Sequence, residues 1–491
     1  MARGDEITRE RMRKIEELRK AGINPYTYKF DKKNNAAELQ EEFKGLKEEK
    51  FGKGKNAKVV VAGRLMTIRN MGKLAFAKLQ DLSGFIQIVL QDGKTPTKEM
   101  EFFSKYLDSG DIVGVSGNIF KTKRGELSIM VDKIELLTKS ILPLPEKFHG
   151  IQDDEERLRK RYLDIIMNED VKNMFIKQSK FWQTMRTFLL DRGFLEVETP
   201  VLETSAGGAS ATPFSTHHNA LNLDVYLRIS MGELWQKKLL VAGYEKTFEI
   251  GRQFRNEGMD MEHLQDYTQM EFYWGYADYK DGMKLVEEMY KQVTKEVLGT
   301  LKFKTHGYEV DLGKKWELYD YEALIKKETG IEIYEDSVEK IKKTLEKLKV
   351  DYEDSVDKWR LVDVLWKYCR KKLTGPGFLV NQPVDVSPLA KRSREDPRKV
   401  EQFQVIIAGT ELGNGYSELN DPLDQEQRFK EQQKKKDAGD SESMEHDNSF
   451  IEALKYAMPP ACGFGVSVRF FSYLMDKPIR ECVFFPLMRP E

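Results

Sequence analysis

Residues 248–257 read FEIGRQFRNE, and after a polar segment that contains His263 the sequence continues as YTQMEFY over residues 267–273. Two β-rich runs on either side of a polar segment predict a strand, a loop and a returning antiparallel strand. Arg255 and Glu257 are two residues apart, so they face the same side of the first strand. From spacing alone, the pattern is compatible with a structural ion-pair ladder to an acidic residue of the second strand, or with a functional site.

The overall composition is that of a folded protein with balanced charge. The chain has 491 residues, with 80 Lys and Arg against 81 Asp and Glu, and 40% of its residues are hydrophobic. This balance excludes a uniformly basic coat but not a local basic face. No apolar run approaches the roughly 18 residues that span a bilayer, and the N-terminus has no apolar stretch typical of a signal peptide. The cysteines are far apart without metal-binding spacing, which favours a reduced, cytoplasmic protein (Cys369, Cys462, Cys482).

The N-terminal part divides into a helical segment and a β-rich segment. Residues 1–57 are predicted to be an N-terminal helical extension. Residues 1–60 carry 16 Lys or Arg and 11 Asp or Glu, which fits a solvated helix or an arm that touches a polyanion. Residues 58–142 hold five short β-rich runs divided by turn residues, which predicts a small closed barrel of the oligonucleotide-binding (OB) type.

Residues 150–491 alternate helical and β-rich patterns and are predicted to form a second, larger domain. Within it, the apolar spacing over residues 171–190 predicts a long amphipathic helix. Residues 430–447 (KEQQKKKDAGDSESMEHD) are strongly charged and predict a mobile connector.

Three segments of this larger domain resemble the signature motifs of class II aminoacyl-tRNA synthetases. Residues 248–273 resemble motif 2. Residues 193–200 (GFLEVETP) resemble motif 1, whose proline ends a strand at the dimer interface, and residues 463–469 (GFGVSVR) occupy the place of motif 3. Within class II, further segments are similar to the lysyl-tRNA synthetase family: residues 161–164, 216–220, 226–229, 385–391, 413–420 and 485–489.

This resemblance covers nearly the whole chain and implies both fold and activity. It implies an α+β protein in which residues 58–142 are an OB-fold anticodon-binding barrel. Residues 150–491 are then the class II catalytic domain, an antiparallel sheet flanked by helices. The implied activity is that of a lysyl-tRNA synthetase, which activates L-lysine with ATP and transfers it to tRNA(Lys). The family also implies a cytoplasmic homodimer.

The resemblance assigns the ATP site residue by residue. Arg255 is implied to hold the α-phosphate and the lysine carboxylate, since its planar guanidinium meets both bidentately. Arg469 is implied to lie against adenine and to reach the γ-phosphate, and these two arginines are the implied catalytic residues. Glu257 and His263 match ATP-contacting positions, and Tyr267 matches an aromatic residue that stacks on adenine.

The implied lysine pocket is anionic, because a strongly hydrated ammonium needs anions to offset its desolvation. Glu233, Glu271 and Glu418 match its acidic positions, although a lone glutamate is usually a surface residue. The neighbouring pocket positions are matched by Gly208, Tyr273, Asn414 and Tyr416.

In the barrel, three residues match positions that read the anticodon: Phe76, Gln87 and Glu126. An aromatic ring can stack on an unstacked base, while an amide and a carboxylate read base edges. Taken alone, the pattern at Phe76 favours a place in the barrel core.

Two positions depart from the family's pattern near the phosphates. Of two carboxylates that bind magnesium, one is present as Glu411, whereas the other position is Gln404, a weaker ligand for a hard cation. Motif 3 usually has an acidic residue before its arginine, and here that residue is Val468. The expected cofactor is therefore Mg²⁺ at Glu411, with the number of ions open and Gln404 a doubtful ligand.

Three alternatives remain open. Gln404 and Val468 fit a paralogue with weakened catalysis that acts on a non-tRNA acceptor, although such a ligase has little use for an anticodon reader. A non-catalytic nucleic-acid-binding protein is disfavoured by the retained arginines and acidic residues. An aspartyl- or asparaginyl-tRNA synthetase shares the architecture, but an aspartate site needs a cationic pocket and this one is anionic.

Overall fold

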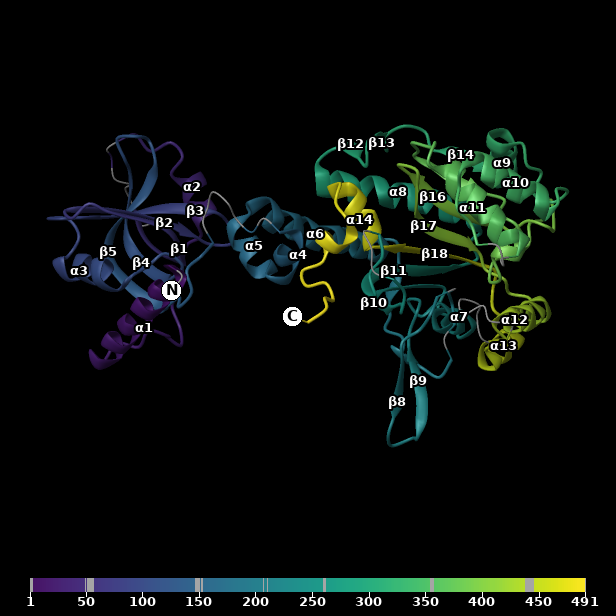
Figure 1. The fold of residues 1–491 in the computed structure, drawn as a ribbon, viewed down its shortest axis with the longest axis horizontal. Helices are drawn as coiled ribbons and strands as arrows, with labels where there is room; N and C mark the ends of the chain where they lie inside the picture. The colour runs from purple at the N-terminus through teal and green to yellow at the C-terminus, as the bar shows by residue number, and fades with distance from the viewer. Residues whose placement is uncertain are drawn as a thin grey trace. The chain divides into compact units, whose positions relative to one another are not determined.

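The computed structural model describes residues 3–48, 50, 57–145, 151, 153–205, 207–209, 211–258, 262–353, 357–437 and 446–490. The chain separates into two compact units, Met1–Gln152 and Asp153–Glu491 (Figure 1). The boundary that the sequence predicts at residue 150 lies outside the described residues.

The first unit contains a closed barrel of five strands, which confirms the predicted fold. Its strands are β1 (Lys58–Asn70), β2 (Leu74–Gln80), β3 (Phe85–Gln91), β4 (Ile112–Lys121) and β5 (Leu127–Thr138). They pair in the order β1-β2-β3-β5-β4 and close between β4 and β1. Alternate residues of β2, including Ala75 and Ala77, are buried in the core. Phe76 between them faces outward, so it is not part of the barrel core.

Three helices accompany the barrel: α1 (Arg3–Lys20), α2 (Ala36–Glu42) and α3 (Thr97–Tyr106). Helix α1 is anchored by Arg11, whose buried guanidinium donates hydrogen bonds to the backbone oxygens of Ser109, Ser140 and Leu142. The basic N-terminal helix is therefore docked on this unit rather than projecting as a free arm.

The second unit is built around an eight-stranded sheet. Its strands are β6 (Leu195–Glu196), β10 (Lys246–Phe254), β11 (Asp266–Gly275), β14 (Glu317–Asp320), β15 (Gly377–Val380), β16 (Gln402–Ile407), β17 (Thr410–Ser417) and β18 (Ala461–Ser467). They lie in the order β14-β15-β16-β17-β18-β11-β10-β6. The sheet is antiparallel from β15 to β10, and only the two outermost pairs are parallel. This arrangement confirms the predicted antiparallel sheet.

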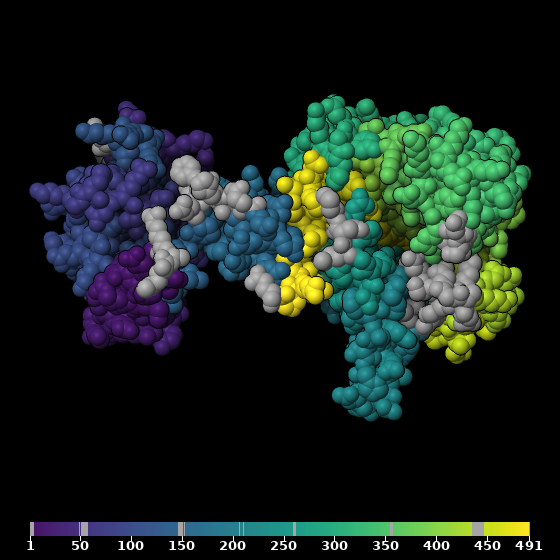
Figure 2. Space-filling model, in the orientation of Figure 1, coloured from purple at the N-terminus to yellow at the C-terminus, as the bar shows by residue number. Residues whose placement is uncertain are grey.

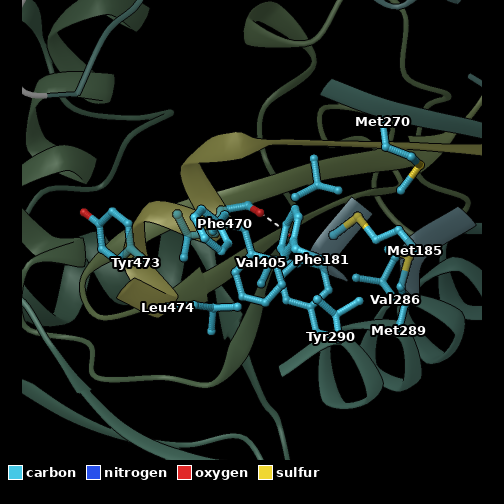
Figure 3. Close-up of a cluster of buried hydrophobic side chains, with 14 of the residues drawn as sticks. Phe181, Met185, Met270, Val286, Met289, Tyr290, Val405, Phe470, Tyr473 and Leu474 are labelled. Carbon is cyan, nitrogen blue, oxygen red and sulfur yellow. Dashed lines mark hydrogen bonds between the residues drawn. The ribbon is translucent and has the colours of Figure 1, made fainter. Parts of the chain in front are cut away.

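One face of the sheet carries the hydrophobic core. It is covered by α6 (Glu169–Leu190), α8 (Tyr279–Leu298) and α14 (Val468–Met475). Figure 3 shows side chains from these helices meeting side chains of the sheet: Phe181, Met185, Val286, Met289, Tyr290, Phe470, Tyr473 and Leu474 against Met270 and Val405. Because side chains alternate along a strand, the residues between these core positions face the opposite side.

The opposite face is covered at its two ends. Helices α9 (Tyr321–Thr329), α10 (Val338–Leu348) and α11 (Lys358–Arg370) pack on β15 and β16. Helices α7 (Glu233–Val241), α12 (Pro422–Asp437) and α13 (Asn448–Lys455) pack around Tyr273 of β11. The part of the sheet between the two groups remains accessible.

The remaining elements lie around this frame. They are α4 (Asp154–Arg159), α5 (Arg161–Met167), β7 (Leu202–Glu203), β8 (Ser215–His218), β9 (Leu223–Leu227), β12 (Lys302–Thr305), β13 (Tyr308–Asp311) and the short 3₁₀ turns Val384–Val386 and Ile479–Cys482. Strands β8 and β9 form a hairpin that projects from the body of this unit, as the space-filling view shows (Figure 2). Among the described residues, no helix combines the length and apolar character that crossing a bilayer requires.

The prediction of a mobile connector over residues 430–447 is wrong for its first part. Helix α12 continues to Asp437, because its first half is held firmly. Phe429 is buried in the core of α7 and α13, and Arg428 donates to the backbone oxygens of Ser387 and Ala390. Residues 438–445 lie outside the described residues.

Candidate active site

A cavity of about 450 Å³ opens on the accessible part of the sheet. This volume is within the usual range for a small-molecule site. Every residue predicted for the ATP and lysine sites lines it: Gly208, Glu233, Arg255, Glu257, His263, Tyr267, Glu271, Tyr273, Gln404, Glu411, Asn414, Tyr416, Glu418 and Arg469. These residues come from segments far apart in the sequence, so the fold brings them together. Their individual roles stay predictions.

The hairpin of β10 and β11 places Arg255 directly after the end of β10. The Arg255 backbone N–H donates to the Gln265 oxygen at 2.8 Å, and its Nε donates to the Ile229 oxygen at 3.4 Å. The guanidinium carbon lies 6.0 Å from the centre of the Tyr267 ring. Tyr267 lines the same cavity and its pKa is raised by burial. The arginine is thus fixed at its base, with an aromatic ring beside its charged end.

Glu271 is a buried acceptor, not a rung of an ion-pair ladder with Arg255. Its Oε1 accepts from the Met231 backbone N–H at 3.1 Å and from Gln269 Nε2 at 2.6 Å, and its Oε2 accepts from the Tyr273 hydroxyl at 3.0 Å. Burial, with the nearby charge of Glu233, raises the pKa of Glu271 to about 7. These contacts hold a carboxylate in place at the cavity floor.

Glu233 and Glu418 complete a group of three buried carboxylates that we call the acidic pocket (Glu233, Glu271 and Glu418). Glu233 begins helix α7, Glu271 lies on β11, and Glu418 follows β17. Burial raises the pKa of Glu418 to about 8. The glycine at position 463 is required here, because a Cβ would lie only 2.1 Å from Glu418 Oε1.

Arg469 lies in the first turn of α14, directly after β18. The Ser467 side chain caps this helix by accepting from the Arg469 backbone N–H at 3.2 Å. The Arg469 guanidinium also forms an ion pair with Glu262 at the cavity rim. The start of the helix adds partial positive charge to that of the arginine, a combination that favours anionic groups. This end of the cavity is therefore cationic, whereas the acidic pocket is anionic.

Comparison with known proteins agrees with this geometry. Residues 153–489 match the family model described as "tRNA synthetases class II (D, K and N)", and residues 59–137 match an "OB-fold nucleic acid binding domain". The chain is 42% identical to a lysine–tRNA ligase of Thermosipho africanus, over 99% of this chain and 96% of that protein. Lysine–tRNA ligases of Thermotoga maritima (99% of this chain, 96% of that protein) and Staphylococcus aureus (98% and 97%) are 43% and 44% identical. This chain belongs to the lysine–tRNA ligase family of class II synthetases.

The residues that the family resemblance assigns to the anticodon lie in the barrel, apart from this cavity. Phe76 is partly exposed on β2, and Gln87 lies on the adjacent β3, where its Nε2 donates to the Ser128 hydroxyl at 2.8 Å. Because Lys78 pairs with Gln87 in the register of β2 and β3, Phe76 and Gln87 share the outer face. Glu126 is exposed just before β5. The three are thus available to a ligand of the barrel.

The position that the sequence predicts for magnesium carries a single carboxylate. Glu411 lines the cavity, and Gln404 Nε2 lies 3.5 Å from Glu411 Oε2. No group of three acidic, histidine or cysteine side chains that could hold a metal occurs among the described residues. One carboxylate fits a single Mg²⁺ that takes its other ligands from ATP oxygens and water. It does not fit a metal held by the protein alone.

The structure also identifies residues that the sequence analysis missed. Trp366 and Arg370 of α11 both contact Glu411, and Lys237 of α7 contacts two carboxylates of the acidic pocket. Only Lys237 carried a local signal, because it is four residues after Glu233 on one helix face. The contacts of Trp366 and Arg370 depend on tertiary packing that no spacing indicates.

Proposed function

We propose that the protein is an ATP-dependent lysine–tRNA ligase, which forms lysyl-adenylate and then lysyl-tRNA(Lys). The observation that carries this proposal is the pairing, within one cavity, of the acidic pocket with the two arginines Arg255 and Arg469. Buried carboxylates suit a substrate with ammonium groups, and arginines suit carboxylates and phosphates.

In the proposed first step, a carboxylate oxygen of lysine attacks the α-phosphorus of ATP and pyrophosphate leaves. The lysine carboxylate is already ionised at neutral pH, so the step needs no general base. The protein contributes positioning and charge neutralisation. Arg255 would hold the α-phosphate and the lysine carboxylate, and Arg469 would contact the distal phosphates. Glu257, His263 and Tyr267 would bind the rest of ATP.

In the proposed second step, a terminal ribose hydroxyl of the tRNA attacks the lysyl carbonyl and AMP leaves. Selection of lysine rests on the acidic pocket, with Tyr273, Asn414, Tyr416 and Gly208 shaping its walls. Glu411 would hold one Mg²⁺ together with ATP oxygens, which neutralises phosphate charge. Gln404 would contact water rather than the ion.

The rest of the chain is proposed to serve tRNA binding and assembly. Residues 58–142 would read the anticodon through Phe76, Gln87 and Glu126, residues 1–57 would extend that domain, and residues 150–491 would carry the catalysis. We also propose a homodimer in the cytoplasm. A dimer is supported by exposed apolar side chains next to the edge strand β6, in and just after the motif 1 segment (Leu195, Val201 and Leu202).

The test is ATP–pyrophosphate exchange with each of the twenty amino acids, followed by charging of tRNA. We expect exchange with lysine alone and lysine-dependent charging of tRNA(Lys). Exchange with lysine but no charging of any tRNA would favour a ligase for another acceptor. Absence of exchange with every amino acid would favour a non-catalytic role.

A further inference from the structure

Lys237 lies beneath the floor of the acidic pocket and does not itself line the cavity. Its side chain is 1% exposed, its Nζ donates to Glu233 Oε1 at 2.7 Å, and it lies 2.6 Å from Glu418 Oε2. The rings of Tyr416 and Phe450 are 5.5 and 5.8 Å away. A lysine is almost never fully buried unless it is paired, so the burial of Lys237 must have a structural or functional reason.

We infer that Lys237 is a positioning residue for lysine recognition, a built-in counter-ion that fixes Glu233 and Glu418 and sets the net charge of the acidic pocket. This inference rests on the proposed function, because it assumes that the acidic pocket binds the ammonium groups of L-lysine.

Lys237 balances part of the charge of the acidic pocket. Three carboxylates buried together repel one another and lose their hydration, which is costly. When all three are ionised, as pairing with a bound lysine requires, one ammonium in contact with two of them leaves a net charge of two negatives. Free L-lysine brings two ammonium groups, while its carboxylate is left to Arg255. With Lys237 present, the charge of the pocket therefore matches that of its substrate.

The carboxylate oxygens of Glu233 and Glu418 are divided between Lys237 and the cavity. Glu233 uses Oε1 for both Lys237 and the Tyr416 hydroxyl. Glu418 forms an ion pair with Lys237 through Oε2, and both of its oxygens are buried without a hydrogen-bond donor among the described residues. An acceptor of this kind is costly unless a ligand supplies the donor. Lys237 thus binds one side of each carboxylate and holds the rest of the group toward the cavity.

The electrostatics of Lys237 agree with a permanent charge. Burial works against its charged form, but Glu233 and Glu418 outweigh this effect and raise its pKa. The other titratable groups that face this cluster are Glu271, Tyr273 and Tyr416, and the tyrosine pKa values are raised well above their usual value by burial. The tyrosines therefore stay neutral, and Lys237 is the cation of the cluster.

The test is equilibrium binding of L-lysine and of ATP, each measured by calorimetry on the full-length protein. Lys237→Met keeps the stem and removes the charge. We expect it to weaken lysine binding by at least about tenfold and to leave ATP binding nearly unchanged, because a desolvated charge pair is lost next to the lysine site alone. The matched control is Lys238→Met, which removes a charge from the next residue of α7, where Nζ contacts Ser449 instead. It should bind lysine normally.

A double-mutant cycle separates a counter-ion from a purely structural residue. Adding Lys237→Met to Glu418→Gln restores the charge balance, so it should cost much less lysine affinity than Lys237→Met costs in the wild type. Equal costs in the two backgrounds would overturn the inference. If Lys237→Met fails to fold, the double variant should fold, because its net buried charge equals that of the wild type. If neither folds, the inference predicts that Lys237→Arg, which keeps the charge, still folds and binds lysine, and its failure would count against the inference.

A failure of the inference on Lys237 can be distinguished from a failure of the proposed function. If the wild-type protein shows no lysine-dependent pyrophosphate exchange, the proposed function fails. If the wild type uses lysine and folded Lys237→Met binds lysine as tightly as the wild type, only the inference on Lys237 fails.

Discussion

The Nη1 atom of Arg370 lies 3.3 Å from Oε1 of Glu411, and the indole N–H of Trp366 donates to the same oxygen. The carboxylate that we propose as the magnesium ligand is therefore partly neutralised by the protein itself. With Gln404 as its neutral neighbour, the immediate surroundings of Glu411 carry little net charge. A site of this kind depends on ATP to bring the metal, because phosphate oxygens supply the negative charge that the protein lacks.

This geometry makes the magnesium requirement testable. Gln404→Glu adds a carboxylate beside Glu411, and magnesium prefers carboxylate oxygens to a neutral amide. We expect the wild type to be active but to need more free magnesium than Gln404→Glu for half-maximal lysine-dependent pyrophosphate exchange. A magnesium titration of both proteins measures this. Gln427→Glu, which adds the same charge on the exposed side of α12, is the control and should behave as the wild type.

Two results would contradict the proposed role of Gln404 beside the magnesium ligand. Identical half-saturation in the wild type and Gln404→Glu would show that this position is no metal site. Lower activity of Gln404→Glu at every magnesium concentration would show that the local geometry has been rebuilt around the amide and its contact with Glu411.

Glu271→Gln tests the acidic pocket directly. The amide keeps the shape but removes the charge that faces the substrate ammonium, and loss of one partner of a desolvated charge pair costs about 2–5 kcal/mol. We expect the lysine concentration needed for exchange to rise sharply, with a smaller effect on ATP. Glu245→Gln, a charge removal at an exposed position, is the matched control. Unchanged lysine dependence of Glu271→Gln would refute the assignment.

Phe76→Ala tests whether the barrel reads tRNA. Phe76 lies on the outer face of β2, so its removal should not open a cavity in the barrel core. Loss of one base stack costs about 1–3 kcal/mol, so charging of tRNA should weaken while formation of lysyl-adenylate stays intact. The control is Phe102→Ala on α3, a ring that packs against Tyr106. If both variants are folded and charge tRNA as the wild type does, Phe76 is no part of the tRNA site.

The sequence predicted local structure and the motif positions well, for physical reasons. The paired runs of β10 and β11 alternate so regularly that Met270 and Phe272 face the core while Glu271 faces the cavity. The closed barrel followed from strand and turn signals alone. The set of residues that line the cavity was predicted from the family resemblance, because no spacing within one segment relates Glu233 to Glu418.

What the sequence could not predict are contacts made by tertiary packing. Lys237 is followed directly by Lys238, and two adjacent lysines are typical of a solvated helix face. In the structure, α12 and α13 cover the face of α7 that carries Lys237 and bury it. Arg370 lies on α11, and only the packing of α11 on the sheet brings it to Glu411. The connector over residues 430–447 was misjudged because the buried contacts that hold its helix are made by Arg428 and Phe429, which lie just before it.

The stability of the protein should depend on pH through Glu271 and Glu418, the two glutamates of the acidic pocket whose pKa values are shifted. Burial raises the pKa of Glu271 to about 7 and that of Glu418 to about 8, from a usual value of 4.5. A raised folded-state pKa means that the folded protein holds these protons longer than the unfolded chain. The free energy of unfolding therefore falls as pH rises from about 5 to 8, the window between the unfolded and folded pKa values.

Lysine should oppose this loss, because its ammonium groups pair with the ionised carboxylates. We expect the increase in unfolding temperature caused by L-lysine to grow as pH rises from 5.5 to 8.5, since at low pH the ligand must displace protons from Glu271 and Glu418. Thermal unfolding with and without L-lysine across this range is the measurement. Glu418→Gln should flatten the profile because it removes one of the titrating groups, while Lys238→Met, outside the pocket, should leave it unchanged. A lysine-induced shift that is constant with pH would mean that these two carboxylates do not change protonation when lysine binds, and that the charge of Lys237 outweighs burial and already keeps Glu418 ionised in the free protein.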